Sequence, residues 1–245
     1  MSCRIEDYGL IGDCETAALV GRDGSIDWLC WPAFDSDACF AALLGTDKHG
    51  RWLIAPAEEV TKTSRRYRDN TLILQTRFET ASGVVELIDF MPPRGNASDV
   101  VRLVRGVSGR VGLRMQLVIR FGFGADIPWV KRTEDGALLA IAGQDMTVLR
   151  TPIETRGEDL TTVADFEVSA AGVLPQYGHA ESLPSGRSKG QSLPDPKKTE
   201  FRRTPNASSQ DAKTPCHEPV CLDHRRRGFA RVHEWIPLAN ASPTL

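Results

Sequence analysis

The strictest constraint on the fold is a run in which apolar residues occupy every second position. Leucine, methionine, isoleucine and phenylalanine alternate in this way from Leu113 to Phe121, and most of the positions between them carry arginine or glutamine. Successive side chains of a strand point to opposite faces, so this period of two predicts a strand with one buried face. Ala164, Phe166 and Val168 repeat the pattern opposite acidic residues. A helix would need a period near 3.6 residues, which is not what these segments show.

Further short segments that favour β-strands recur at roughly ten-residue spacing. They are separated by residue pairs typical of turns, such as Asp23-Gly24, Ser82-Gly83, Ser108-Gly109 and Asp135-Gly136. Only Ala38 to Leu44 could form a helix, of about two turns. Many short strands without intervening helices predict an all-β fold, an antiparallel β-sandwich. The further strands that we expect span residues 16–20, 25–30, 51–54, 71–79, 84–90, 100–105, 137–142 and 146–150.

The composition changes near residue 172. Residues 173–245 hold nine of the fifteen prolines, and Ile, Leu, Val, Phe and Met make up only 12 of these 73 residues. A segment so poor in core residues cannot bury enough apolar surface to offset the entropy of ordering. We therefore expect a folded domain over residues 1–172 and a disordered, Pro-rich tail over residues 173–245.

Charge and cysteine usage narrow the class of protein. The net charge of −2 argues against binding to nucleic acid through bulk charge, and no uncharged apolar run is long enough for a membrane helix. The first residues contain no signal peptide, and the six scattered cysteines are best interpreted as reduced thiols. We expect a cytoplasmic protein that binds neither nucleic acid nor membranes.

The first forty residues carry the most specific pattern, a strand, an Asp-Gly turn and a returning strand that ends in a Trp-rich loop. The strings Ile5 to Asp13, Asp23 to Pro32 and Phe34-Asp35-Ser36 resemble the opening of the bacterial glucoamylase and trehalase group of glycoside hydrolase family 15. The resemblance continues through Asp89-Phe90-Met91-Pro92-Pro93 and Pro128-Trp129-Val130, and fades between residues 172 and 184.

The resemblance implies a trehalase-like N-terminal β-sandwich that normally precedes an (α/α) barrel. In that family the barrel carries the general acid and the general base of an inverting hydrolase, which lie roughly 6.5–9.5 Å apart. None of the positions matched in this chain carries a catalytic role in the family, so we expect no catalytic residue here, and the chain alone to be inactive. Two residues of the Trp-rich loop differ from the family's usual sequence: Ala33 stands where arginine is common, and Asp37 stands where proline is common.

The candidate contact residues are Trp28, Trp31, Phe34 and Asp35. Aromatic faces can stack on a sugar ring, but the same residues can instead fill the core or dock a neighbouring domain. The carboxylates near them, including Asp23 with Asp27 and Asp35 with Asp37, fit turn caps better than general acids. Cys216, Cys221, His224 and His233 lack zinc-ligand spacing, so we expect no metal and no cofactor.

Three hypotheses follow. The chain is an accessory domain of a family 15 α-glucoside hydrolase that packs on a barrel this chain lacks. Alternatively, it is a free-standing carbohydrate-binding module, or a truncated gene product with a frame-shifted tail. Exposure of Trp28 and Trp31 separates the first two, since a binding module needs both on the surface.

Overall fold

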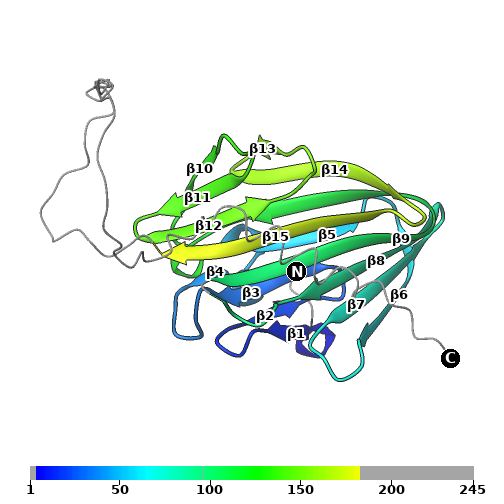
Figure 1. The fold of residues 1–245 in the computed structure, drawn as a ribbon, viewed down its shortest axis with the longest axis horizontal. Coiled ribbons are helices and arrows are strands. Elements are labelled where there is room, and N and C mark those ends of the chain that lie inside the picture. The colour runs from blue at the N-terminus through cyan, green and yellow to red at the C-terminus, as the bar shows by residue number, and fades with distance from the viewer. Residues whose placement is uncertain (1–3, 96, 183–245) are drawn as a thin grey trace, which may run out of the picture. The chain divides into compact units, whose positions relative to one another are not determined.

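The computed structural model describes residues 4–95 and 97–182, which form fifteen β-strands and four single-turn 3₁₀ helices (Figure 1). Every strand pairing is antiparallel, which confirms the predicted all-β, sandwich-like fold. The strands are β1 (Gly9–Gly12), β2 (Ala17–Val20), β3 (Ser25–Cys30), β4 (Ala38–Phe40), β5 (Arg51–Pro56), β6 (Val60–Tyr67), β7 (Leu74–Thr80), β8 (Gly83–Phe90), β9 (Ser98–Val118), β10 (Trp129–Arg132), β11 (Leu138–Ala142), β12 (Asp145–Arg150), β13 (Arg156–Glu158), β14 (Thr161–Ser169) and β15 (Val173–Ser182). The 3₁₀ helices are η1 (Ile5–Asp7), η2 (Ala42–Leu44), η3 (Asp47–His49) and η4 (Gly122–Gly124).

The strands form two sheets that share β9. The first half of β9 pairs with β15 and β8, within the order β10-β11-β12-β15-β9-β8-β7-β6. The second half pairs with β5 and β14, within the order β1-β2-β3-β5-β9-β14-β13. The sheet that contains β5 and β14 is called the first sheet, and the sheet that contains β15 and β8 is called the second sheet. The long β9 can be followed through both in Figure 1.

The bend that carries β9 from one sheet to the other lies at residues 107–110. These four residues are exposed, whereas inward-facing residues on either side are buried. Gly109 has a φ of +67°, and a Cβ there would lie 2.1 Å from the carbonyl oxygen of Ser82, so only glycine fits. The Ser108-Gly109 turn predicted between two separate strands was therefore wrong, because the chain bends within one continuous strand.

The predicted strand face does form the core. Leu113, Met115, Leu117 and Phe121 are each at most 5% exposed, and Ile119 packs against the same cluster from a half-buried position. The cluster also contains two large rings from other strands, Trp52 of β5 and Phe78 of β7. Residues from both sheets thus contribute to one apolar core.

A buried ion pair lies within this core. Arg102 of β9 and Asp89 of β8 both have fully buried side chains, and Nε of Arg102 lies 2.8 Å from Oδ1 of Asp89. The guanidinium also donates to the carbonyl oxygens of Trp52 and Gly24, the latter at 2.6 Å, and stacks over the Trp52 ring. Trp52 belongs to β5 of the first sheet and Gly24 to the turn between its strands β2 and β3, so one side chain from the second sheet satisfies polar groups of the first.

Two sequence predictions require correction. Ala38–Leu44 is not a helix but strand β4 followed by η2, because Ala38 and Phe40 are buried and pair with β3. The ordered sheet also continues beyond residue 172 into β15, which inserts between β9 and β12. The prediction of disorder for residues 183–245 lies outside the described residues.

The strand β15 was not predicted because its sequence lacks the alternating large apolar residues that mark a half-buried strand. Its inward positions carry Leu174, Gln176 and Gly178 instead of a run of large apolar residues. A Cβ on Gly178 would lie 3.3 Å from Cη2 of Trp31 and 3.6 Å from Cζ3 of Trp52. The two tryptophans supply the apolar volume that the strand itself lacks.

The Arg102–Asp89 pair generates a prediction for stability. Asp89→Ala should lower the free energy of unfolding in urea by about 3–5 kcal/mol, since it leaves the Arg102 charge buried without a counter-charge. The matched control is Glu167→Ala in the exposed pair of Arg110 with Glu167, which should cost less than about 1 kcal/mol. Equal losses for the two variants would contradict the role assigned to the buried pair.

Candidate functional site

The candidate contact residues lie in β3 and in the loop that follows it, residues 31–37, and their side chains differ in how deeply they are buried. Trp31 is 7% exposed and belongs to the main core. Trp28 is half-buried, packs against Cys30, Ala38 and Ala41, and has its ring centroid 6.2 Å from that of Phe123. Burial thus prevents Trp31 from meeting a sugar ring directly, and the two tryptophans do not form one exposed platform.

Phe34 and Asp35 occupy the surface of the same loop. The Phe34 side chain is 63% exposed, and Asp35 is also exposed. The backbone nitrogen of Phe34 donates to the carbonyl oxygen of Glu15 at 2.9 Å, which fixes the loop to the β1–β2 connection. These two side chains are therefore exposed on an anchored backbone.

Asp13 and Arg94 provide the main anchor of this loop. Nε of Arg94 lies 3.0 Å from Oδ2 of Asp13, and the same guanidinium donates to the carbonyl oxygen of Pro32 within the loop. Asp13 also accepts hydrogen bonds from the Ser98 hydroxyl at 2.8 Å and from the backbone nitrogen of Thr16 at 2.9 Å. Although burial opposes it, these hydrogen bonds lower the pKa of Asp13 below its ordinary value.

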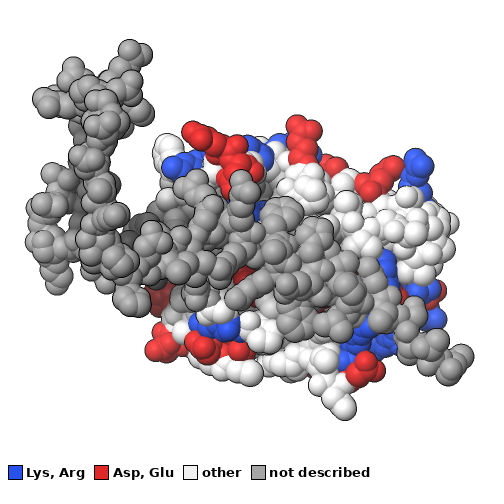
Figure 2. All heavy atoms as spheres, viewed as in Figure 1, with Lys and Arg blue, Asp and Glu red and all other residues white. Residues whose placement is uncertain are grey.

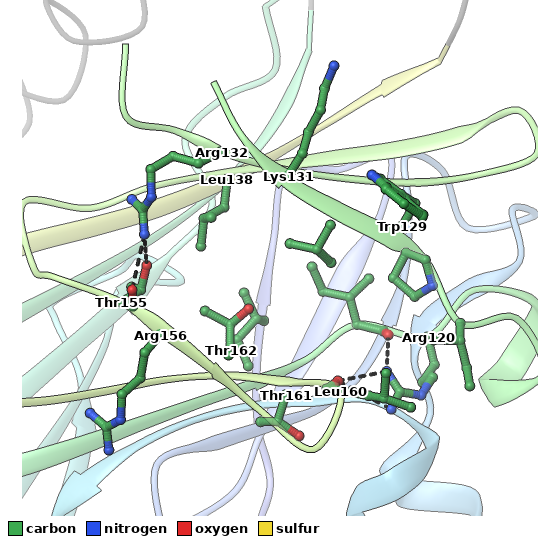
Figure 3. Close-up of a pocket in the computed structure, with 16 residues that line it drawn as sticks. Arg120, Trp129, Lys131, Arg132, Leu138, Thr155, Arg156, Leu160, Thr161 and Thr162 are labelled. Atoms are coloured by element: carbon green, nitrogen blue, oxygen red, sulfur yellow. Dashed lines mark hydrogen bonds between the residues drawn. The ribbon is translucent and has the colours of Figure 1, made fainter. Parts of the chain in front are cut away.

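A second feature of the surface is a pocket of about 450 Å³ between β10 and the β13–β14 hairpin (Figure 3). Its walls are mainly apolar, and they also include three threonines and four cationic side chains. Arg132 reaches across from β10 and donates to the Thr155 hydroxyl at 2.7 Å. The lining residues are Leu117, Ile119, Arg120, Ile127, Pro128, Trp129, Val130, Lys131, Arg132, Leu138, Thr155, Arg156, Gly157, Leu160, Thr161 and Thr162.

No carboxylate lines this pocket. An inverting glycosidase needs two, one with a raised pKa and one ionised, on opposite sides of a sugar. The pocket can therefore bind apolar or anionic groups, but it cannot supply the acid and the base of glycoside hydrolysis.

The carboxylates named in the sequence analysis do not line this pocket, and two of them form hydrogen bonds within the domain. Asp27 accepts a hydrogen bond from the Tyr8 hydroxyl at 2.6 Å, and Asp23 accepts one from the backbone nitrogen of Ser25 at 3.1 Å. The pKa of Asp145 is raised by burial and by the negative charges of Asp37 and Asp126. Within residues 4–95 and 97–182, no group of three His, Cys, Asp or Glu side chains is arranged to hold a metal ion. Cys216, Cys221, His224 and His233 lie outside the described residues.

The pocket was missed at the sequence level. Pro128-Trp129-Val130 contributed to the family resemblance, but the sequence alone did not predict that this segment lines a pocket. All four residues of β10 are exposed, so it has no alternation to mark it as a strand. The sequence feature that indicates a contact surface is Trp129 close to two cations, Lys131 and Arg132, in a segment without alternating apolar residues.

No helix in the described part of the chain has the length and apolar character required to cross a membrane. Charges of both signs are interspersed over the described surface visible in Figure 2.

Comparisons with known proteins agree on one family. The family model described as "Trehalase-like, N-terminal" matches residues 1–178. Trehalase 1 of Sulfolobus acidocaldarius is 35% identical over 132 residues, and the trehalase of Thermoplasma volcanium is 32% identical over 139 residues. Each of these matches covers 54% of this chain and 22% of the relative. The trehalase of Mycolicibacterium smegmatis is 39% identical over 79 residues, which are 32% of this chain and 12% of that protein. The chain thus spans about a fifth or less of the length of these relatives.

The lowered pKa of Asp13 gives a prediction with a defined sign. Its stabilising contribution is complete above the unfolded pKa of about 3.9 and is lost as the pH falls through the lower folded value. Asp13→Asn should therefore be about 1–3 kcal/mol less stable than the unmodified chain at pH 7, and this difference should shrink below about pH 4. Urea unfolding at a series of pH values measures it. A constant difference down to pH 2 would refute the assignment.

Proposed function

The chain belongs to the trehalase-like N-terminal family, and we propose that it is the non-catalytic N-terminal domain of a glycoside hydrolase of the glucoamylase and trehalase type, family 15. The observation that carries this proposal is the family match over residues 1–178. The matched part is 22% of each of two trehalases, so most of their length lies outside it. In this proposal the catalytic carboxylates reside in an (α/α) barrel domain, which cleaves an α-glucoside.

The surface chemistry supports a docking role. Trp31 is buried and Trp28 is half-buried, whereas a sugar-binding platform requires exposed ring faces. Three large exposed apolar side chains, Ile127, Trp129 and Leu160, instead lie together around one pocket, and Phe34 is exposed separately. Exposed apolar side chains that gather in one place are typical of surfaces that another protein domain covers. We propose that Phe34 and Asp35 contact the barrel and help to shape one edge of its substrate pocket.

We further propose a cytoplasmic location. Cys14, Cys30 and Cys39 are free thiols, which suits a reducing compartment. Burial and then the neighbouring Asp37 charge raise the pKa of Cys30, so its thiol stays protonated and unreactive at neutral pH.

The proposal predicts that the chain alone releases no glucose from trehalose, maltose or longer α-glucans. The reason is that the pocket between β10 and the β13–β14 hairpin has no carboxylate in its lining, whereas glycoside hydrolysis needs two. Glucose release is measured against a buffer blank, with trehalase 1 of S. acidocaldarius as the positive control. Turnover that disappears in Asp23→Asn, Asp27→Asn, Asp35→Asn or Asp37→Asn would place a catalytic site in this domain and overturn the proposal.

The docking role is tested by binding. The full chain is mixed with trehalase 1 of S. acidocaldarius from which its own trehalase-like N-terminal domain has been removed, and the mixture is analysed by sedimentation velocity. We expect a complex of one chain with one barrel, which intact trehalase 1 does not form because its own domain occupies the site. Failure to form a complex, together with binding of soluble α-glucans by the chain, would support a free-standing carbohydrate-binding module instead.

A further inference from the structure

The pocket between β10 and β13 lies where the two sheets end side by side. β10 is the last strand of the second sheet and pairs only with β11, while β13 is the last strand of the first sheet and pairs only with β14, within the described residues. Leu117 and Leu138, which also contact the core, line this pocket. The sandwich is therefore open along this side, and unpaired strand edges flank the opening.

Large apolar side chains around the opening face solvent. Trp129 is 76% exposed, Leu160 69% and Ile127 56%. They sit on the rim of the pocket rather than at its bottom, so a ligand held inside the pocket would leave them in water. Only a partner broad enough to cover both the pocket and its rim would bury them.

Uncompensated positive charge surrounds the same opening. Arg120 is only 8% exposed, yet its guanidinium donates to the carbonyl oxygens of Ile119 and Leu160 and has no carboxylate partner among the described residues. Lys131 and Arg132 likewise form no ion pair there, although Arg132 donates to Thr155. Arg156 differs, because Glu158 and Asp165 neutralise it.

This charge stands out because residues 1–172 carry 19 Lys and Arg against 25 Asp and Glu. An arginine buried without a counter-charge is costly unless a partner supplies the negative group. Burial lowers the pKa of Arg120, which agrees with a charge that lacks compensation in the isolated domain.

We infer that the β10–β13 opening is the docking site for a segment of the catalytic domain in which a large apolar side chain is flanked by carboxylates. The apolar side chain enters the gap beside Leu138 and covers Trp129, and a carboxylate pairs with Arg120 or Arg132. This inference rests on the proposed function, and it adds a contact surface to the one that Phe34 and Asp35 provide.

The test uses the complex with the shortened trehalase 1 described above and measures its dissociation constant by isothermal titration calorimetry. Trp129→Ala and Lys131→Glu should each weaken binding about tenfold or more, since the first removes the large aromatic side chain that the partner covers and the second reverses a charge beside it. Both residues are exposed, so their replacement should leave the unfolding midpoint of the chain unchanged. Arg120→Gln should weaken binding similarly and reduce its dependence on salt concentration.

The matched controls lie on the opposite side of the second sheet. Lys62→Glu alters an exposed lysine on β6, the far edge strand, and Leu72→Ala alters a 46% exposed leucine in the turn between β6 and β7. Both should leave the dissociation constant within about twofold of the unmodified value. If Arg120→Gln fails to fold, Trp129→Ala and Lys131→Glu still decide the question.

Each outcome separates the inference from the proposal on which it rests. Complete absence of binding by the unmodified chain contradicts the proposed function and with it this inference. Binding that survives Trp129→Ala and Lys131→Glu but is lost in Phe34→Ala leaves the proposed function standing and overturns the inference. Self-association of the chain alone that Trp129→Ala abolishes would assign the opening to a second copy, and would also overturn it.

Discussion

The guanidinium of Arg102 is the polar connection on which the two sheets depend. It emerges from β9 and pairs with Asp89 on the neighbouring strand. It also donates to the carbonyl oxygens of Trp52 in the opposite sheet and of Gly24 in the turn between that sheet's strands β2 and β3. Because all of these groups are buried, each hydrogen bond lost would leave a polar atom without water to replace it. The interaction therefore fixes how the sheets face one another, which apolar packing alone specifies only loosely. Burial raises the pKa of Asp89 and the Arg102 charge opposes that effect, so the carboxylate depends on its partner to remain ionised.

Polar anchoring recurs on a smaller scale at the surface. Arg94 binds both Asp13 and the carbonyl oxygen of Pro32, and so holds the loop that presents Phe34. The β10–β13 opening shows the opposite situation, since Arg120 has carbonyl partners but no carboxylate among the described residues. The domain thus satisfies its buried charge where the structure must be rigid. It leaves charge unsatisfied where, in our proposal, another domain completes the packing.

The sequence predicted the second half of β9 well because it has one buried and one more exposed face. The alternation from Leu113 to Phe121 led directly to the core face of β9, and the Asp23-Gly24 signal marks a real turn between β2 and β3. Prediction failed where period two is absent. β10 is exposed on both faces, and β15 is buried through Gln176 and Gly178, whose neighbours across the core supply the apolar volume. The depths of Trp28 and Trp31 could not be deduced either, since both stacking and packing require the same residues at the same spacing.

The position of β15 also dictates an order of assembly. It is the last described strand of the chain, yet it lies in the middle of its sheet and is the only link in the strand order between β12 and β9. A chain emerging from the ribosome can form the β10-β11-β12 meander early, because its pairings are local. That meander has no place in the sheet until residues 173–182 have been synthesised. Until then its exposed tryptophan and unpaired edges remain available to other nascent chains, which makes this side of the domain prone to association during synthesis.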